Sequence, residues 1–226
     1  MFLGIDIGTS AVKVICTDGT AIHATATADL TVQSPHSGWS EQTPDAWWVA
    51  TCAALAEIAE TMPLSGVTGI GLSGQMHGAV LLDSAREVLR PAILWNDSRS
   101  TEDCARLQAA LPEIGSIAGV LPLPGFTAPK LMWVAREEPD VHARIAHILL
   151  PKDYIGLRLH GELATDRSDA AGTLWLDQAA RDWSHVVAEA SDTDPGWLPR
   201  LADGHEVVGQ VTAAAAAETG LPAGIP

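Results

Sequence analysis

Residues 4–13 read Gly-Ile-Asp-Ile-Gly-Thr-Ser-Ala-Val-Lys and predict two β-strands joined by a very short turn. The first strand carries the carboxylate of Asp6 to the turn, which consists of three small residues, Gly8, Thr9 and Ser10. Small residues let backbone N–H groups and hydroxyls meet a phosphate closely, and Asp6 can hold a metal ion through water. A plain β-hairpin with an acidic rim also fits these residues. The stretch is not a Walker A loop, because the spacing Gly-x-x-x-x-Gly-Lys-Ser/Thr does not occur around it.

The apolar patterning outside this stretch predicts a mixed α/β protein. Three β-rich runs open the chain, and their short connections favour an antiparallel meander; they span residues 2–7, 11–17 and 22–32. Further strands are expected at residues 67–72, 79–82 and 92–95, and helices at residues 101–110, 128–136, 152–159, 184–189 and 213–217. Residues 112–129 hold four prolines and three glycines, which indicates a long functional loop or a crossover into a second helical layer.

A longer helix is expected to begin at Pro44. Thr43 precedes it, Pro44 takes the first helical position, and Asp45 places an acid in the first turn. Apolar residues then recur at helical spacing, at Trp48, Cys52, Leu55, Ala59 and Met62. This spacing predicts that these side chains form the buried stripe of an amphipathic helix that ends before Pro63.

Composition and charge exclude several classes of protein. Of the 226 residues, 47% are apolar, so the chain can fill a core. Its 13 basic and 28 acidic residues give a formal charge of −15, which repels nucleic acid, anionic lipid and also ATP. A nucleotide site must therefore rely on backbone N–H groups and a metal ion. The three widely spaced cysteines favour a reducing, cytoplasmic setting, and neither a signal peptide nor a membrane-spanning run is expected.

Residues 69–74 spell Gly-x-Gly-x-x-Gly, the pattern of a dinucleotide-binding loop. That interpretation is rejected, because the pattern requires a helix directly after the glycines and the next residues predict a turn and a strand. The last of these glycines is better grouped with the residues after it, as Ser-Gly-Gln-Met-His-Gly at residues 73–78. Taken without its flanking pattern, His77 is better explained as a structural histidine than as a ligand contact.

Two further segments carry candidate residues. Residues 95–99 read Trp-Asn-Asp-Ser-Arg, in which Asp97 either orients a ligand hydroxyl or caps the helix expected near Thr101. Residues 124–131 read Pro-Gly-Phe-Thr-Ala-Pro-Lys-Leu, in which Phe126 either packs on a ligand or joins the core. The remaining charged residues of these segments, Arg99 and Lys130, are expected to be structural. Asp153 and Asp169 are secondary candidates, because an acid at a helix start is usually a cap.

These segments, taken in order, resemble the FGGY family of carbohydrate kinases, and most closely its xylulokinases. The family belongs to the actin, Hsp70 and sugar-kinase superfamily, so the resemblance implies a ribonuclease-H-like domain with a mixed sheet flanked by helices. It implies that residues 1–226 form the amino-terminal domain, with a helical or loop insertion around residues 112–165, and that the carboxy-terminal domain, which comes after a strand and a turn bearing the catalytic base, is absent from this chain.

The same resemblance implies roles for particular residues. Asp6 would support the metal and the phosphate as a catalytic residue, and the nucleotide would meet Gly8, Thr9, Ser10 and Lys13. The sugar would contact Gln75, Met76, His77, Asp97 and Phe126. The expected cofactors are ATP and Mg²⁺.

The implied activity is ATP-dependent phosphorylation of D-xylulose to D-xylulose 5-phosphate in a full-length parent enzyme. This chain alone is expected to be inactive, since half of a cleft supplies only half of what phosphoryl transfer needs. Two alternatives stay open: a non-catalytic actin-like fragment that binds sugar or nucleotide, or a kinase of the same family for another sugar such as ribulose. The expected partners are the sugar, ATP, the chain's own carboxy-terminal domain and a second copy in a homodimer, with no nucleic acid or membrane.

Overall fold

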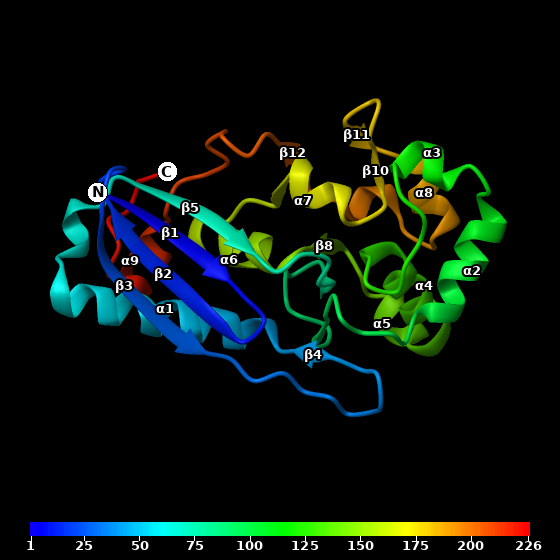
Figure 1. Ribbon diagram of the computed structural model, residues 1–226, viewed down its shortest axis with the longest axis horizontal. Coiled ribbons are helices and arrows are strands. Elements are labelled where there is room, and N and C mark those ends of the chain that lie inside the picture. Colours follow the sequence, from blue (N-terminus) through cyan, green and yellow to red (C-terminus); the bar gives the residue numbers. More distant parts are fainter.

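The computed structural model describes residues 1–226, and its architecture is α/β as predicted (Figure 1). A four-stranded sheet in the order β3-β2-β1-β5 is built from β1 (Phe2–Ile7), β2 (Ala11–Thr17), β3 (Ile22–Asp29) and β5 (Gly69–Gly74). The first three strands form the predicted antiparallel meander. β5 pairs with β1 in parallel, so both strands end at the same edge of the sheet.

One face of this sheet is buried and the other is open. Leu3, Ile5 and Ile7 alternate with more exposed residues along β1 and are at most 2% exposed. The buried face packs against α1 (Pro44–Thr61) and α6 (Pro151–His160), and α9 (Ala213–Thr219) packs against these two helices. The open face carries the side chain of Asp6 beside the end of β1.

α1 begins at Pro44 as predicted, but its buried face is centred elsewhere on the helix. Of the five predicted residues, Trp48 and Leu55 are buried, Cys52 and Met62 are partly buried and pack against the core, and only Ala59 is exposed, so the prediction was wrong for Ala59. The helix also buries Trp47, Thr51, Ala54 and Ile58. Residues 48, 52, 55, 59 and 62 and residues 47, 51, 54 and 58 both recur at helical spacing, and tertiary packing centres the buried face on the set that begins at Trp47.

A second hydrophobic cluster draws on residues between Ala79 and Ala188 and lies at the other end of the molecule (Figure 1). Its buried residues come in part from the helices α2 (Thr101–Ala110), α3 (Ile114–Ala118), α4 (Thr127–Glu137) and α8 (His185–Ala190), and α5 (Pro139–His142) packs against it through Val141. The helix α7 (Arg167–Ala171) contributes no residue to this cluster. Short strand pairs tie the loops together: β4 (Glu41–Gln42) with β7 (Ala92–Ile93), β6 (Val80–Leu82) with β8 (His147–Leu149), β9 (Ala164–Asp166) with β12 (Arg200–Ala202), and β10 (Leu176–Asp177) with β11 (Asp182–Trp183).

All the predicted strands and helices exist; β1, β2 and α2 have the predicted ends, and most of the others have shifted ends. β3 stops at Asp29 rather than at residue 32. β5 spans Gly69–Gly74 rather than residues 67–72, because a short 3₁₀ turn at Leu64–Gly66 comes before it and delays the start of the strand. The proline-rich residues 112–129 contain α3 and the start of α4, so they combine a loop with a crossover into the second cluster.

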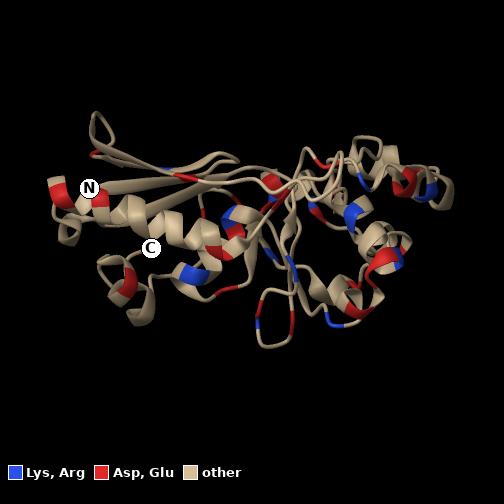
Figure 2. Ribbon diagram, turned by 90° about the horizontal axis from the view of Figure 1, so that it is seen from below, with Lys and Arg blue, Asp and Glu red and all other residues tan.

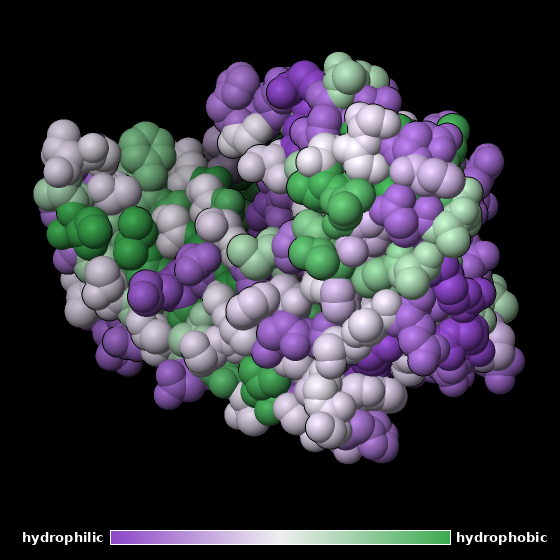
Figure 3. Space-filling view, turned by 45° about the vertical axis from the view of Figure 1, so that its right-hand side comes forward, coloured by the Kyte–Doolittle hydropathy of each residue, from purple (hydrophilic) through white to green (hydrophobic).

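The surface shows how charge and shape are distributed. Lys and Arg are scattered singly among acidic residues along the chain (Figure 2). In the space-filling view the molecule is hollowed between the part built on the four-stranded sheet and the rest (Figure 3). None of the helices has both the length and the apolar character needed to cross a membrane.

Candidate active site

The two turns that the sequence singled out lie side by side. In the parallel register Ile7 pairs with Gly74, so residues 8–10 and residues 75–78 leave the same edge of the sheet. Gln75 N–H donates to the carbonyl of Ile7 at 2.8 Å, and the Thr9 hydroxyl donates to Gln75 Oε1 at 2.9 Å. The segment after Asp6 and the segment before His77 therefore form one continuous wall.

The turn after β1 is tight, and its groups differ in availability. Gly8 N–H donates to the carbonyl of Ala11 at 3.0 Å, and a Cβ at Gly8 would lie 2.9 Å from that oxygen, so a larger residue does not fit. The Thr9 hydroxyl is engaged, because it donates to Gln75 and accepts from Trp95 Nε1 at 3.0 Å. The Ser10 side chain is exposed and makes no hydrogen bond within the protein, so its hydroxyl is free for a ligand.

Asp6 and Lys13 face each other across β1 and β2 on the open face of the sheet. Both side chains are exposed, and neither forms an ion pair within the protein. Mg²⁺ is usually held by one or two carboxylates together with water and substrate phosphates. No group of three or more potential metal-ligating side chains exists in the molecule. Asp6 thus offers a single exposed carboxylate, which is the number of protein ligands that such an ion needs at the least.

The imidazole of His77 is held in one orientation. Nδ1 lies 2.6 Å from the carbonyl oxygen of Gly172, and the ring makes an edge contact with Phe126 at 4.8 Å between centroids. Burial lowers the pKa of His77 to about 4, so the ring is neutral near pH 7. A carbonyl oxygen only accepts, so Nδ1 carries the proton and Nε2, which has no partner in the protein, is left as a hydrogen-bond acceptor.

The backbone of His77 is itself unusual. Its φ angle is 65°, in the left-handed region that residues with a side chain seldom adopt. Such strain persists only where the surroundings enforce it, and it concentrates at functional sites. The two residues before it differ: Met76 is 46% exposed, whereas Gln75 is buried with its amide bonded to Thr9, Gln42 and the Gly8 carbonyl.

Asp97 is buried in an ion-pair network rather than pointing into an open space. Its carboxylate is 1% exposed, binds Arg99 through both oxygens at 2.9 and 2.7 Å, and accepts from Ser40 N–H at 2.6 Å. Arg99 also reaches Glu41 at 2.7 Å, so Arg99 is structural as predicted. Asp97 does not cap α2, which begins after Ser100, and that alternative was wrong.

Asp153 and Asp169 belong to a cluster around Lys152 and also serve as helix-start acids. Asp153 accepts from the backbone N–H of Leu150, which is the cap that the sequence suggested for it. Lys152 Nζ lies 2.9 Å from Asp166 and 3.2 Å from Asp169, and it also contacts Asp153. Burial opposes the charge of Lys152, but the three carboxylates outweigh it and raise its pKa. This cluster adjoins Gly74 and the carboxyl end of β5.

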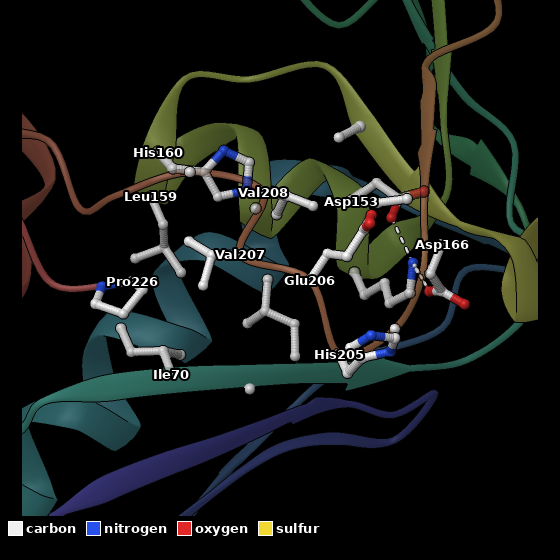
Figure 4. A pocket seen from close by; sticks show the side chains of 18 of the residues that line it. Ile70, Asp153, Leu159, His160, Asp166, His205, Glu206, Val207, Val208 and Pro226 are labelled. Atoms are coloured by element: carbon white, nitrogen blue, oxygen red, sulfur yellow. Dashed lines mark hydrogen bonds and ion pairs between the residues drawn. The ribbon is translucent and has the colours of Figure 1, made fainter.

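A groove of about 390 Å³ lies beside β5 and not at His77. Figure 4 shows Ile70 on its floor and Val207 and Val208 on the segment that crosses above, with Asp153 and Asp166 at one end and Pro226 at the other. None of the predicted site residues from Asp6 to Phe126 lines it. Its floor is the outer edge of the sheet, where Ile70 N–H donates to the Pro226 carbonyl at 2.9 Å.

Sequence reasoning missed three residues that shape the site. Trp95 ties the Thr9 hydroxyl in place, Gln42 links Gln75 to the Thr9 carbonyl, and Gly172 orients His77. Trp95 could have been found, because it lies two residues before Asp97 in a segment that already holds a candidate. Gln42 and Gly172 are distant in sequence from the residues that they bind, so only the fold could reveal these contacts.

Comparison with known proteins agrees along the whole chain. Residues 1–226 match the family model described as the N-terminal domain of the FGGY family of carbohydrate kinases. A xylulose kinase of Escherichia coli strain K12 is 50% identical over 210 residues, which cover 92% of this chain and 43% of that protein. A xylulose kinase of Klebsiella pneumoniae is 48% identical over 223 residues, which cover 98% of this chain and 46% of that protein.

Solved structures give the same picture. The crystal structure of xylulose kinase from Rhodospirillum rubrum superposes with a TM-score of 0.95 at 34% sequence identity, covering 99% of this chain and 47% of that one. This similarity confirms the ribonuclease-H-like fold of the actin and sugar-kinase superfamily. The chain spans less than half of the length of these relatives.

Proposed function

Because the chain belongs to the FGGY family of carbohydrate kinases, we propose that it supplies the sugar contacts and one phosphate turn for ATP-dependent phosphorylation of D-xylulose to D-xylulose 5-phosphate in a full-length enzyme. One observation carries the proposal. The parallel register of β1 and β5 brings the turn after Asp6 and the loop around His77 to the same edge, where a Thr9–Gln75 hydrogen bond joins them. Donor and acceptor sites side by side are what phosphoryl transfer requires.

Kinases of this family use ATP as the phosphate donor. For the donor, this chain offers backbone N–H groups and single charged side chains rather than a basic pocket. Gly8 and Ser10 supply a turn that a phosphate can approach closely, and Lys13 adds one exposed cation nearby. Asp6 would hold Mg²⁺ through water; when bound, that ion neutralises charge on the phosphates. The Thr9 hydroxyl positions the wall itself, so its part in nucleotide binding is through the backbone.

On the acceptor side, the neutral imidazole of His77 presents Nε2 to a sugar hydroxyl, which donates to it. The exposed Met76 and the ring of Phe126 supply apolar surface for the carbon skeleton of the pentulose. Gln75 and Asp97 are buried and have no free side-chain group to offer the sugar. We propose that Gln75 influences sugar binding through its hydrogen bond with Thr9, and Asp97 through its ion pair with Arg99.

The open edge of β5 supports a further partner, the rest of a full-length enzyme. Ile70 N–H and Gln75 N–H point to opposite sides of β5, so the N–H groups of Leu72 and Gly74 point away from β1, and Leu72 lines the cavity. An unpaired strand edge above a groove is suited to accept another strand. A strand added there would end beside Gly74, next to the wall described above. We propose that the catalytic base of the full-length enzyme reaches the sugar along this route and that the present chain alone shows negligible turnover.

Ligand binding tests the proposed function directly. D-xylulose at 100 times its Kd should stabilise the 226-residue chain by about 2.7 kcal/mol, whereas glycerol should not, and D-ribulose reports on specificity. Thermal shift and calorimetry measure these effects, and His77→Ala should remove most of the stabilisation. A coupled ADP assay should detect no phosphorylation by the chain alone. Equal stabilisation by all polyols, or an unchanged response in His77→Ala, would disprove the sugar assignment.

A glycine far from the sugar loop in sequence gives a sharper test of the His77 orientation. A Cβ at Gly172 would lie 2.5 Å from Cε1 and 2.6 Å from Nδ1 of His77, while the φ of −74° at Gly172 suits alanine. Gly172→Ala should therefore displace the imidazole without straining its own backbone and weaken D-xylulose binding by roughly 10- to 100-fold. Gly66→Ala is the matched control, because a Cβ there meets nothing within 4 Å. Unchanged affinity in Gly172→Ala would show that the ring position does not matter.

A further inference from the structure

A fully buried lysine lies directly behind the sugar loop. Lys130 is 0% exposed, and its Nζ donates to the carbonyl of His77 at 2.9 Å and to the carbonyl of Gly125 at 2.7 Å. It comes from the first turns of α4, two residues after Ala128, whose N–H binds the Thr173 carbonyl at 3.0 Å. The start of α4 therefore contacts three segments that lie around the imidazole, those of His77, Gly125 and Thr173.

Burying an ammonium group costs free energy, and the pKa of Lys130 reflects that cost. Burial lowers the pKa of Lys130 to about 7, with Asp97 raising it and Arg99 lowering it. A methionine or leucine would fill the same space without that cost. The amino group nevertheless lies where it donates to two backbone carbonyls on either side of the site, and it can donate in either protonation state, which indicates that the hydrogen bonds, and not the volume, are what the position requires.

One of the two carbonyls belongs to a member of a ring pair, and the other belongs to the residue before the second member. His77 carries the first carbonyl, and Gly125, which carries the second, precedes Phe126, whose ring meets the imidazole edge-on. Thr127 Oγ1 donates to the same His77 carbonyl at 3.2 Å. These donors act on a residue with a φ of 65°, a conformation that the chain does not adopt without support.

We propose that Lys130 is a positioning residue of the sugar loop: its ammonium group fixes the peptide carbonyls of His77 and Gly125, and so holds the imidazole between Gly172 and Phe126. Lys130 does not touch the sugar. The geometric part of this proposal is independent of the ligand, and its consequence for sugar affinity rests on the proposed function.

Lys130→Met removes the donor and keeps the bulk. Nitrogen-detected NMR of the imidazole, assigned by its absence in His77→Ala, should show a single tautomer protonated at Nδ1 in the unmodified chain. In Lys130→Met we expect exchange between tautomers or loss of that signal, and a fall in D-xylulose affinity of roughly 10-fold or more. Thr127→Val removes only the longer bond, so it should cause a smaller change in the same direction. It serves as the test if Lys130→Met does not fold.

Val134→Ala is the control, because it loosens the buried face of α4 without removing a contact to His77. An unchanged imidazole signal in both Lys130→Met and Thr127→Val, or the same change in Val134→Ala, would overturn the proposal. If the imidazole signal changes as expected but the unmodified chain binds no sugar, the positioning role stands and the proposed function fails.

Discussion

Arg99→Met should destabilise the chain by about 3–5 kcal/mol, measured by urea unfolding at pH 7. The guanidinium is 1% exposed and pairs with Asp97, which is equally buried, and with Glu41, which is 8% exposed. Removing one member of a buried ion pair leaves the other charge without its partner, and that loss exceeds the value of the pair itself. In the variant Glu41 still pairs with Arg90 at 2.6 Å, so the carboxylate that loses its partner is mainly that of Asp97.

The packing of Arg99 adds to this expectation. Its guanidinium lies 3.6 Å from the centroid of Trp39 and 4.9 Å from that of Trp133, so it is held between two indole rings as well as two carboxylates. Each such contact contributes about 0.5–2 kcal/mol. Methionine retains the apolar part of the packing and none of the charge.

A double variant separates the charge from the packing. In Arg99→Met, the further change Asp97→Asn replaces the orphaned carboxylate with a neutral amide of the same shape, so it should restore about 1–3 kcal/mol. Arg144→Met is the matched control, because Arg144 is 65% exposed and lies 3.4 Å from Asp83; it should change stability by less than about 0.5 kcal/mol. A loss below about 1 kcal/mol in Arg99→Met would show that the network is not needed for stability.

The outline of the fold was predictable because local rules agree with the final structure there. The β1–β2 turn, the first helical position at Pro44 and the strand after Gly78 each have strong local signals, and each was confirmed. The centre of the buried face of α1 was not predictable, because two overlapping stripes have similar spacing and only contact with the sheet selects between them. Strand ends shifted for the same reason, since pairing with a neighbour sets them.

Part of the candidate site could likewise be predicted from the sequence, and part of it could not. The turn after Asp6 and the loop around His77 could be identified from residue types and order, and their adjacency comes from the parallel register, which the sequence does not state. The state of each polar group could not be predicted: Thr9 and Gln75 satisfy one another, whereas Ser10 and Nε2 of His77 stay free. That distinction depends on partners such as Trp95 and Gly172, which come from distant parts of the chain.

The cluster around Lys152 should show a different kind of sensitivity, one that depends on pH. Burial raises the pKa of Asp153 to about 6 and also raises that of Asp169, although Lys152 lowers both. An acid whose folded-state pKa lies above its ordinary value of 3.8 favours the folded state when protonated. Its contribution to stability is complete below pH 3.8 and is lost as the pH rises through about 6.

Lys152→Met should enlarge this loss, because it removes the only cation among three carboxylates and raises the pKa of Asp153 and Asp169 further. We expect a destabilisation of about 3–5 kcal/mol at pH 8, where the acids are ionised, and less than half of that at pH 5, where protonation relieves the repulsion. Urea unfolding at the two pH values measures the difference. Lys13→Met, which removes an exposed lysine without an ion pair, should change stability by less than about 0.5 kcal/mol at either pH. Equal losses at pH 5 and pH 8 would contradict the electrostatic account and leave lost packing of the lysine stem against Gly74 as the cause.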